Sequence, residues 1–303
     1  MSPDSTLQCL VDAGNTLGEC PLWCERTQTL YWTDIEAARL HAWQADGGLA
    51  RQWAMPERVG SFALCQQPGQ LLLGLASGIA LFNLNTGGCG PLLPVEADEP
   101  RTRINDGRCD AQGRFVFGMF NQAADAAPIG HFYRVDGRGD AGLQIERLAL
   151  PPVAVANAIA FSPDGGRLYF TDSPSRQIWC VDYPAAGPLG VPQPFARVAE
   201  GDAMPDGAAV DADGGLWCAL WEGGCVLRFG ADGQPTDRLA LAARRATCPA
   251  FGGPALDTLF VTSARVGLDA AALAAQPQAG ALFAATGVRR GLPERRFATA
   301  LRV

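Results

Sequence analysis

Asn157-Ala-Ile-Ala-Phe-Ser-Pro-Asp-Gly-Gly-Arg-Leu-Tyr-Phe-Thr-Asp172 is the stretch of the chain that decides its fold. It opens with a polar residue and a short apolar run, turns at Ser162-Pro-Asp-Gly165, and continues as an apolar strand. Two β-rich runs around such a turn indicate a β-hairpin. Gln177-Ile-Trp-Cys-Val181 follows as a further strand. The stretch therefore predicts a small antiparallel sheet.

This order of elements occurs six times along the chain. Counted from corresponding positions, successive units start 42, 45, 51, 49 and 43 residues apart. Six β-rich units of about this length match the blades of a propeller, whereas a sandwich or jelly roll would not repeat so regularly. The sequence predicts an all-β fold, a six-bladed β-propeller with four-stranded antiparallel blades around a central channel. We expect residues 1–303 to form one domain.

Two segments outside the repeats have expected places. Closing the ring requires the chain ends to meet, so Leu7-Gln-Cys-Leu-Val11 is predicted as an outer strand beside Glu294–Leu301. The Ala-rich segment Asp269–Gln276 is predicted as a short helix inside the sixth unit.

Composition narrows the classes of partner. The 303 residues are 48% hydrophobic and 18% charged, with a net charge of −7 and no run of Lys or Arg. Since an acidic surface repels phosphate backbones, nucleic acid is not an expected partner. The first residues have neither a basic nor an apolar region typical of a signal peptide, and no apolar stretch is long enough to span a bilayer. We expect a cytoplasmic protein that does not contact membranes, is a monomer or weak homo-oligomer, and keeps its ten cysteines reduced.

Polar residues recur at the start of each unit. In a propeller the first strand of every blade lines the channel, so these residues should converge near its axis. They are Glu19, Ser61, Asn105 with Asp106, Asn157, Asp206 and, less regularly, Thr247 with Cys248. Crowded carboxylates repel one another unless a cation lies between them. Such oxygen ligands suit Ca²⁺, Mg²⁺ or Mn²⁺, and less selectively Zn²⁺ or Fe²⁺.

A turn is the alternative interpretation for two of these positions. Pro205-Asp-Gly207 and Asn105-Asp-Gly107 contain residues that are common in turns. Turn chemistry does not require them to fall at the same place in successive units, so their shared position favours a common site. For Asp106 alone, turn stabilisation stays the preferred interpretation.

Four motifs carry a resemblance to a known family. Gly18-Glu-Cys-Pro-Leu-Trp23, Arg103-Ile-Asn-Asp-Gly107, Asn157-Ala-Ile-Ala-Phe161 and Pro205-Asp-Gly-Ala208 resemble the senescence marker protein/gluconolactonase/luciferin-regenerating enzyme family of regucalcin-like sugar lactonases. The resemblance covers nearly the whole chain. It implies one divalent metal ion held by Glu19, Asn157 and Asp206, substrate contacts from Arg103 and Asn105, and Asp206 as the proposed general base.

One departure from the family pattern concerns the substrate. Some members carry an acidic residue after the third-unit strand that helps to bind substrate. This chain has Gly118-Met-Phe-Asn-Gln122 there, without an acid. The identity of the substrate therefore stays open.

The expected reaction is metal-dependent, gluconolactonase-like hydrolysis of an aldonolactone to the aldonic acid, with arabinono- and xylonolactone as further candidates. A metal ion with open positions polarises a carbonyl and lowers the pKa of bound water. Arg103 would donate hydrogen bonds to sugar hydroxyls or to the developing oxyanion.

Two alternatives remain: a calcium-binding, regucalcin-like protein without turnover, and a propeller esterase acting on non-sugar esters. The second would be favoured if aromatic residues such as Phe120 and Trp221 line the mouth. Nucleophilic catalysis is not expected, because the chain has no Gly-x-Ser-x-Gly and only two histidines, His41 and His131, predicted to be structural.

Overall fold

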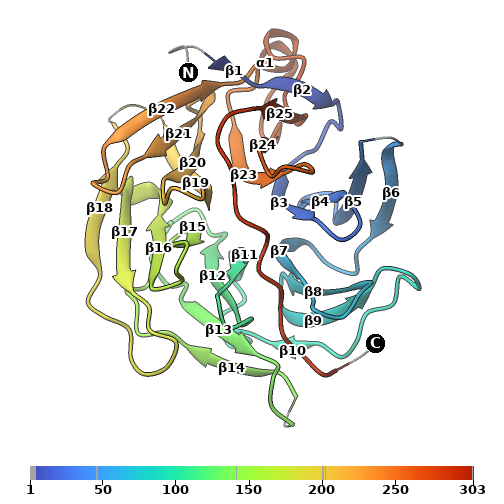
Figure 1. Ribbon diagram of the computed structural model, residues 1–303, viewed down its shortest axis with the longest axis vertical. Helices are drawn as coiled ribbons and strands as arrows, with labels where there is room; N and C mark the ends of the chain where they lie inside the picture. The colour runs from blue at the N-terminus through green and yellow to red at the C-terminus, as the bar shows by residue number, and fades with distance from the viewer. Residues whose placement is uncertain (1–4, 46, 141, 200, 202, 302) are drawn as a thin grey trace.

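Six sheets surround a central axis in the computed structural model, which describes residues 5–45, 47–140, 142–199, 201, 203–301 and 303 (Figure 1). Their strands pair antiparallel, except that residues 5–6 pair parallel with the outer strand of the fifth blade. From the innermost strand of each blade the chain runs outward strand by strand, and the N-terminal segment adds an outer strand to each of the last two blades. Neighbouring innermost strands contact one another around the ring. The predicted six-bladed β-propeller is confirmed.

The first three blades are built from consecutive strands: β3 (Gly18–Cys24), β4 (Thr29–Asp34), β5 (Arg39–Gln44), β6 (Gly48–Ala54); β7 (Val59–Leu64), β8 (Gln70–Leu75), β9 (Gly78–Asn83), β10 (Leu93–Pro94); β11 (Thr102–Cys109), β12 (Phe115–Asn121), β13 (Phe132–Asp136), β14 (Gln144–Arg147). The other three add the short helices η1 and α1 and the N-terminal strands: β15 (Ala156–Phe161), β16 (Arg167–Asp172), η1 (Ser173–Ser175), β17 (Gln177–Asp182), β18 (Gln193–Arg197); β19 (Met204–Val210), β20 (Leu216–Trp221), β21 (Cys225–Phe229), β22 (Pro235–Ala240), β1 (Ser5–Thr6); β23 (Ala246–Gly252), β24 (Thr258–Ser263), α1 (Ala270–Ala275), β25 (Leu282–Thr286), β2 (Gln8–Val11).

The core lies between the blades. Each of six apolar clusters joins one blade to the next, including the last to the first. Tyr31 and Phe62, for example, meet between blades one and two, and Trp32 and Phe260 between blades one and six. Most inner strands are therefore buried on both faces, which explains why they read as near-continuous apolar runs rather than strict alternations.

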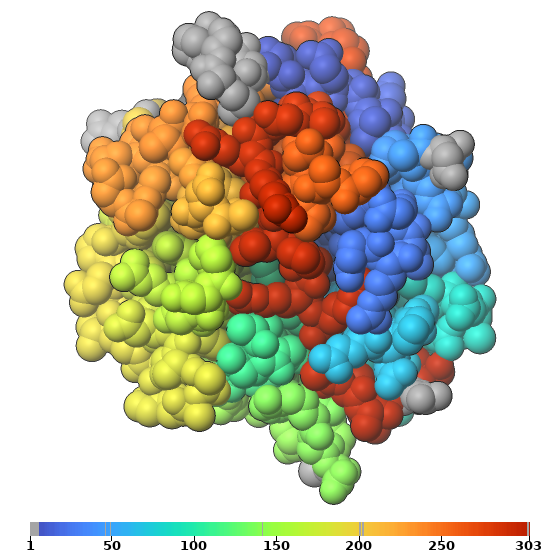
Figure 2. All heavy atoms as spheres, in the orientation of Figure 1, coloured from blue at the N-terminus to red at the C-terminus, as the bar shows by residue number. Residues whose placement is uncertain are grey.

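Ring closure differs in part from the prediction. The N-terminal segment does supply an outer strand, β2, but β2 pairs with β25 and not with residues 294–301. The C-terminal segment instead crosses one end of the channel, where Phe297 bridges to Cys65 and Thr299 bridges to Gly137. Figures 1 and 2 show this segment in red over the centre of the ring. Phe297 is fully buried, so its side chain anchors the segment to the channel end.

Every innermost strand carries a one-residue irregularity in its pairing near the entrance to the blade. A β-bulge bends a strand and changes the direction of its side chains. Asn105 and Asp206 lie within such bulges, while Glu19 and Asn157 directly precede theirs. The polar residues occur at corresponding positions of successive blades, and so do the bulges beside them.

The predicted helix near residue 270 is confirmed as α1, whose N-cap Asp269 accepts a hydrogen bond from Ala272 N. All ten cysteines are free, and most are buried. Within the described ranges, no helix has the length and apolar character needed to cross a membrane.

Candidate active site

All five residues predicted for the site line one cavity of about 380 Å³. It opens at the end of the channel opposite the C-terminal segment, because the site residues lie at the starts of inner strands whereas Cys65 follows the end of β7. The full lining comprises Leu17, Glu19, Ile35, Glu36, Arg103, Asn105, Phe120, Val155, Asn157, Ser173, Pro174, Met204, Pro205, Asp206, Trp221 and Val266.

The carboxylates of Glu19 and Asp206 line this cavity and form no ion pair with any described residue. Burial, together with the nearby charge of Asp106, raises the pKa of Glu19 to about 8. Burial and the charges of Glu19 and Asp106 hold the pKa of Asp206 well above its ordinary range. Such shifts mean that the ionised forms are disfavoured until positive charge is supplied.

The chemistry of these donors fits a hard divalent cation. Two carboxylates and the amide oxygen of Asn157 are the kinds of ligand that such ions prefer. Within the described residues, no three His, Cys, Asp or Glu side chains form a group that could hold a metal ion. The three proposed ligands Glu19, Asn157 and Asp206 are not a group of this kind, because Asn157 is neutral.

The Asn157 side chain is held by a buried hydroxyl. Its Nδ2 donates to Ser173 Oγ at 2.9 Å, and Ser173 Oγ donates to the carbonyl of Pro205 at 2.8 Å. Asn105 Nδ2 donates to the carbonyl of Ala156 at 2.8 Å and approaches Asn157 Oδ1 at 3.3 Å. This network directs the amide oxygen of Asn157 away from Ser173, which is the orientation a ligand oxygen needs.

Arg103 is fixed by its neighbours yet keeps donors free. Its Nη1 donates to the carbonyl of Ile104 at 2.9 Å and to Asn105 Oδ1 at 2.7 Å, and its guanidinium lies 4.7 Å from the centre of the Phe120 ring. Burial and the charge of Arg58 lower the pKa of Arg103 to about 10. Among the described residues, neither its Nε nor its Nη2 finds a hydrogen-bond acceptor. Nη2 is therefore available to a ligand.

Four other channel residues from the sequence pattern, Ser61, Asp106, Thr247 and Cys248, do not line the cavity. Asp106 accepts hydrogen bonds from Gly107 N at 2.8 Å and Ile159 N at 2.7 Å, and so joins the bulges of blades three and four. Thr247 Oγ1 donates to the carbonyl of Gly18 at 2.6 Å. The Ser61 hydroxyl is fully buried away from the cavity. These contacts support a structural role for Asp106.

Sequence reasoning missed Glu36, a third acidic residue that lines the cavity. Glu36 lies in the turn between β4 and β5, and its carboxylate is 3.4 Å from Arg58 Nη1. Arg58 Nη2 also donates to Gln122 Oε1 at 2.6 Å. Glu36 precedes two alanines in an ordinary hairpin turn, so only the spatial arrangement of blades one and two brings it to the site.

The structure shows what replaces the acidic residue that some family members carry after the third-blade strand. Phe120 faces the cavity, whereas the neighbouring Asn121 is 2% exposed and donates to Asp125 Oδ1 at 2.8 Å. Because side chains alternate along a strand, an aromatic ring occupies the inward position of β12. Trp221 also lines the cavity, and the Arg245 guanidinium lies 4.9 Å from its ring centre.

Both histidines lie outside the cavity, in keeping with the predicted structural roles. His41 stacks on Trp32 at 4.9 Å, and burial lowers its pKa to about 4. His131 Nδ1 is 3.0 Å from Glu96 Oε1. Neither residue is placed to activate a nucleophile at the site.

Comparisons with known proteins identify the family of the chain. Over residues 17–265 the chain matches the model of the SMP-30/gluconolactonase/LRE-like region. It is 48% identical to L-arabinolactonase from Azospirillum brasilense, covering 98% of this chain and 97% of that protein. It is 38% identical to 6-deoxy-6-sulfogluconolactonase from Pseudomonas putida, covering 93% and 94%.

The structure of the calcium-binding protein regucalcin from Agrobacterium tumefaciens superposes with a TM-score of 0.89 at 29% identity, covering 98% of this chain and 99% of that one. A fold shared over the full ring and a family match over most of the chain lead to one conclusion. The chain belongs to the SMP-30/gluconolactonase/LRE-like family.

Proposed function

We propose that this protein hydrolyses a sugar lactone to the corresponding aldonic acid with the help of one divalent metal ion. The observation that carries the proposal is the convergence of Glu19, Asn157 and Asp206 with Arg103 and Asn105 around one small cavity. The lactonase names of the relatives at 48% and 38% identity support the reaction class.

Glu19, Asn157 and Asp206 would hold the metal ion. A divalent cation held there supplies positive charge that polarises an ester carbonyl. The same charge would keep Glu19 and Asp206 ionised at neutral pH, against the effect of their burial. This requirement links the unusual electrostatics of the cavity to its proposed use.

Asp206 would have a second task beside metal binding, and Arg103 and Asn105 have tasks that their contacts permit. Asp206, once ionised, accepts the proton of the attacking water. Arg103 donates from Nη2 to a ring hydroxyl or to the oxygen on which negative charge develops. The Asn105 amide positions Arg103 through the 2.7 Å hydrogen bond and presents a polar edge to the sugar.

A five-carbon aldonolactone is the proposed substrate, with L-arabinonolactone as the first choice. The cavity is at the lower end of the range of about 300–1,000 Å³ typical of small-molecule sites, which suits one small ring. The relative with 48% identity is an L-arabinolactonase, which supports this choice over a six-carbon lactone.

Phe120 and Trp221 give one reason to keep hydrolysis of less polar esters as a second candidate. Both rings line the cavity. Each ring, however, already carries a guanidinium, from Arg103 and Arg245 respectively. That arrangement gives the rings a role in positioning charge, which favours the sugar lactone.

The test begins with chelated protein. Mn²⁺, Zn²⁺, Ca²⁺, Mg²⁺ or Fe²⁺ is restored separately, and acid release is followed across five- and six-membered aldonolactones and a neutral aryl ester. We expect metal-dependent acceleration that is largest for a pentonolactone. Metal binding without acceleration of any ester would instead identify a calcium-binding protein, and acceleration of only the aryl ester would favour the esterase.

A further inference from the structure

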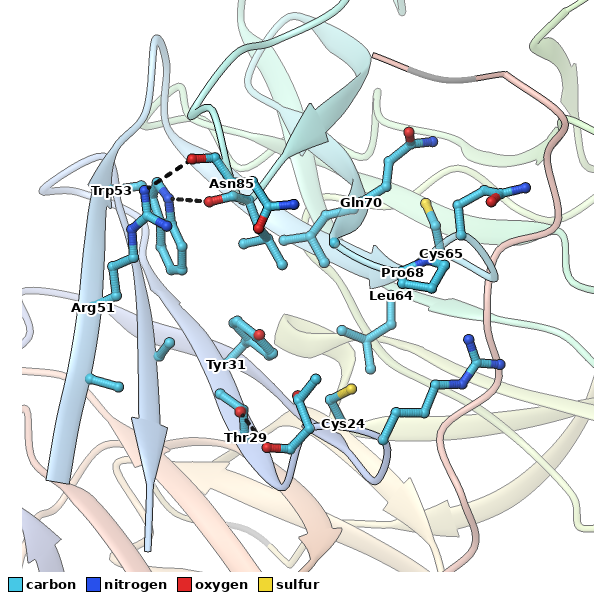
Figure 3. Close-up of a pocket in the computed structure, with 18 of the residues that line it drawn as sticks. Cys24, Thr29, Tyr31, Arg51, Trp53, Leu64, Cys65, Pro68, Gln70 and Asn85 are labelled. Carbon is cyan, nitrogen blue, oxygen red and sulfur yellow. Dashed lines mark hydrogen bonds between the residues drawn. The ribbon is translucent and has the colours of Figure 1, made fainter. Parts of the chain in front are cut away.

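A second pocket lies between blades one and two, away from the proposed active site. Its volume is about 500 Å³. Figure 3 shows Arg51 and Trp53 on one wall, Leu64, Cys65 and Gln70 on the other, and Tyr31 between them. Strand β3 connects the two sites, because Glu19 lies near its start and Cys24, at its end, lines the second pocket.

The charged side chains that line this pocket are all positive. Arg26, Arg51 and Arg296 line it, whereas no Asp or Glu among the described residues does so. Arg296 Nη2 is paired with Glu25 at 2.9 Å, and Arg26 Nε is 3.9 Å from the same residue. Arg51 makes no ion pair within the described part of the chain; it stacks 4.7 Å from the Trp53 ring centre. In a protein of net charge −7, such a group of arginines is suited to an anion.

The uncharged lining adds hydroxyl-binding and ring-stacking capacity. The side-chain amides of Gln67 and Asn85 make no hydrogen bond to any described residue, so each offers a free donor and a free acceptor. Tyr31 and Trp53 form an aromatic floor, with their ring centres 6.4 Å apart. Guanidinium groups, free amides and an aromatic floor together match a small molecule that combines a carboxylate with several hydroxyls.

We propose that this pocket is a second binding site, for a small polyhydroxy carboxylate of the class that lactone hydrolysis produces. The choice of a sugar acid over other hydroxy acids rests on the proposed function. The carboxylate is held by Arg51, which makes no ion pair within the described residues, and the hydroxyls are held by Gln67 and Asn85.

Isothermal titration of the metal-loaded protein with L-arabinonate tests the proposal. The active site also holds this anion, so the titration is repeated with Arg103→Gln, with Arg26→Gln/Arg51→Gln, and with all three changes. We expect binding that survives Arg103→Gln and then weakens by about tenfold or more when Arg26 and Arg51 are also replaced. Arabinitol tests the need for the carboxylate, and acetate tests the need for the hydroxyls; both should bind at least about tenfold more weakly.

The reactivity of Cys24, which lines the second pocket, reports locally on L-arabinonate binding. L-arabinonate should slow its alkylation by iodoacetamide while Cys89, which is exposed and does not line the pocket, reacts unchanged. Loss of all binding in Arg103→Gln, or binding that is indifferent to Arg26→Gln/Arg51→Gln, would overturn the second site. Lactonase activity is measured in parallel: an inactive parent protein refutes the proposed function, whereas an active one without the second binding event refutes only this inference.

Discussion

Replacement of Glu19 by Gln should stabilise the metal-free protein at pH 8 and destabilise the metal-loaded one. In the folded chain, burial and the charge of Asp106 raise the pKa of Glu19 from 4.5 to about 8. A carboxyl whose pKa is raised on folding contributes stability at pH values below 4.5, and that contribution is lost as the pH rises towards 8. The amide introduced by Glu19→Gln has no proton to lose, so the variant escapes this loss.

The magnitude follows from the pKa shift. At about 1.4 kcal/mol for each pKa unit, the full shift corresponds to about 5 kcal/mol. Solvent in the open cavity screens the carboxylate, so we expect about 2 kcal/mol at pH 8 and almost no difference at pH 4.5. With a divalent cation bound, the charged carboxylate becomes a ligand, and the same substitution should weaken metal affinity and lower stability.

Urea unfolding followed by tryptophan fluorescence measures both effects, with chelator or with excess metal, between pH 4.5 and 8. Glu36→Gln is the matched control, because Glu36 lines the same cavity but is paired with Arg58 at 3.4 Å. Equal stabilities of parent and Glu19→Gln at every pH in chelator would refute the electrostatic reasoning. Unchanged metal titration of the variant would refute Glu19 as a ligand.

Four further substitutions test separate parts of the site and fold. Asp206→Asn should lower kcat by about 10³-fold or more while circular dichroism stays unchanged, and an active variant would remove Asp206 as the base. Arg103→Lys should lower kcat/KM about 10- to 100-fold, because the planar fork is lost; parental kinetics would exclude its contact with the substrate. Ser173→Ala should weaken metal affinity about tenfold, with activity recovered at high metal concentration, since the hydroxyl only orients Asn157. Phe297→Ala should cost about 3–5 kcal/mol in urea unfolding and leave KM unchanged, because it anchors the channel end away from the cavity.

The fold was predictable because each blade has a recognisable local sequence pattern that repeats along the chain. Asn157–Asp172 and its counterparts each contain a turn between two apolar runs, and nothing more is needed to specify a hairpin. Ring closure was harder, because it depends on which distant strand offers a free edge. β25 offers that edge to β2, while the segment after Pro293 is drawn over the channel by burial of Phe297. No local pattern distinguishes those two outcomes.

The site was predictable to the extent that its residues share a position in the repeat. Glu19, Asn157 and Asp206 do so, and they line one cavity. Glu36 and Ser173 lie outside the inner strands, in connections whose sequence resembles any solvated turn. Their contribution depends on the angle between neighbouring blades, which a repeat pattern does not contain.

The bulges explain how a regular ring produces a one-sided site. Immediately after the proposed ligands Glu19 and Asn157, Cys20 and Ala158 adopt positive φ angles of 48° and 53°, which are costly for residues with a Cβ atom. The strained backbone therefore lies in β3 and β15, the innermost strands of the first and fourth blades. The second and sixth blades also have bulges, yet Ser61 and Thr247 do not line the cavity. The polar side chains that line the cavity therefore come from blades one, three, four and five, and Phe120 and Trp221 also line it. A ring of six similar blades thus contains an asymmetric cavity, which can orient an asymmetric sugar.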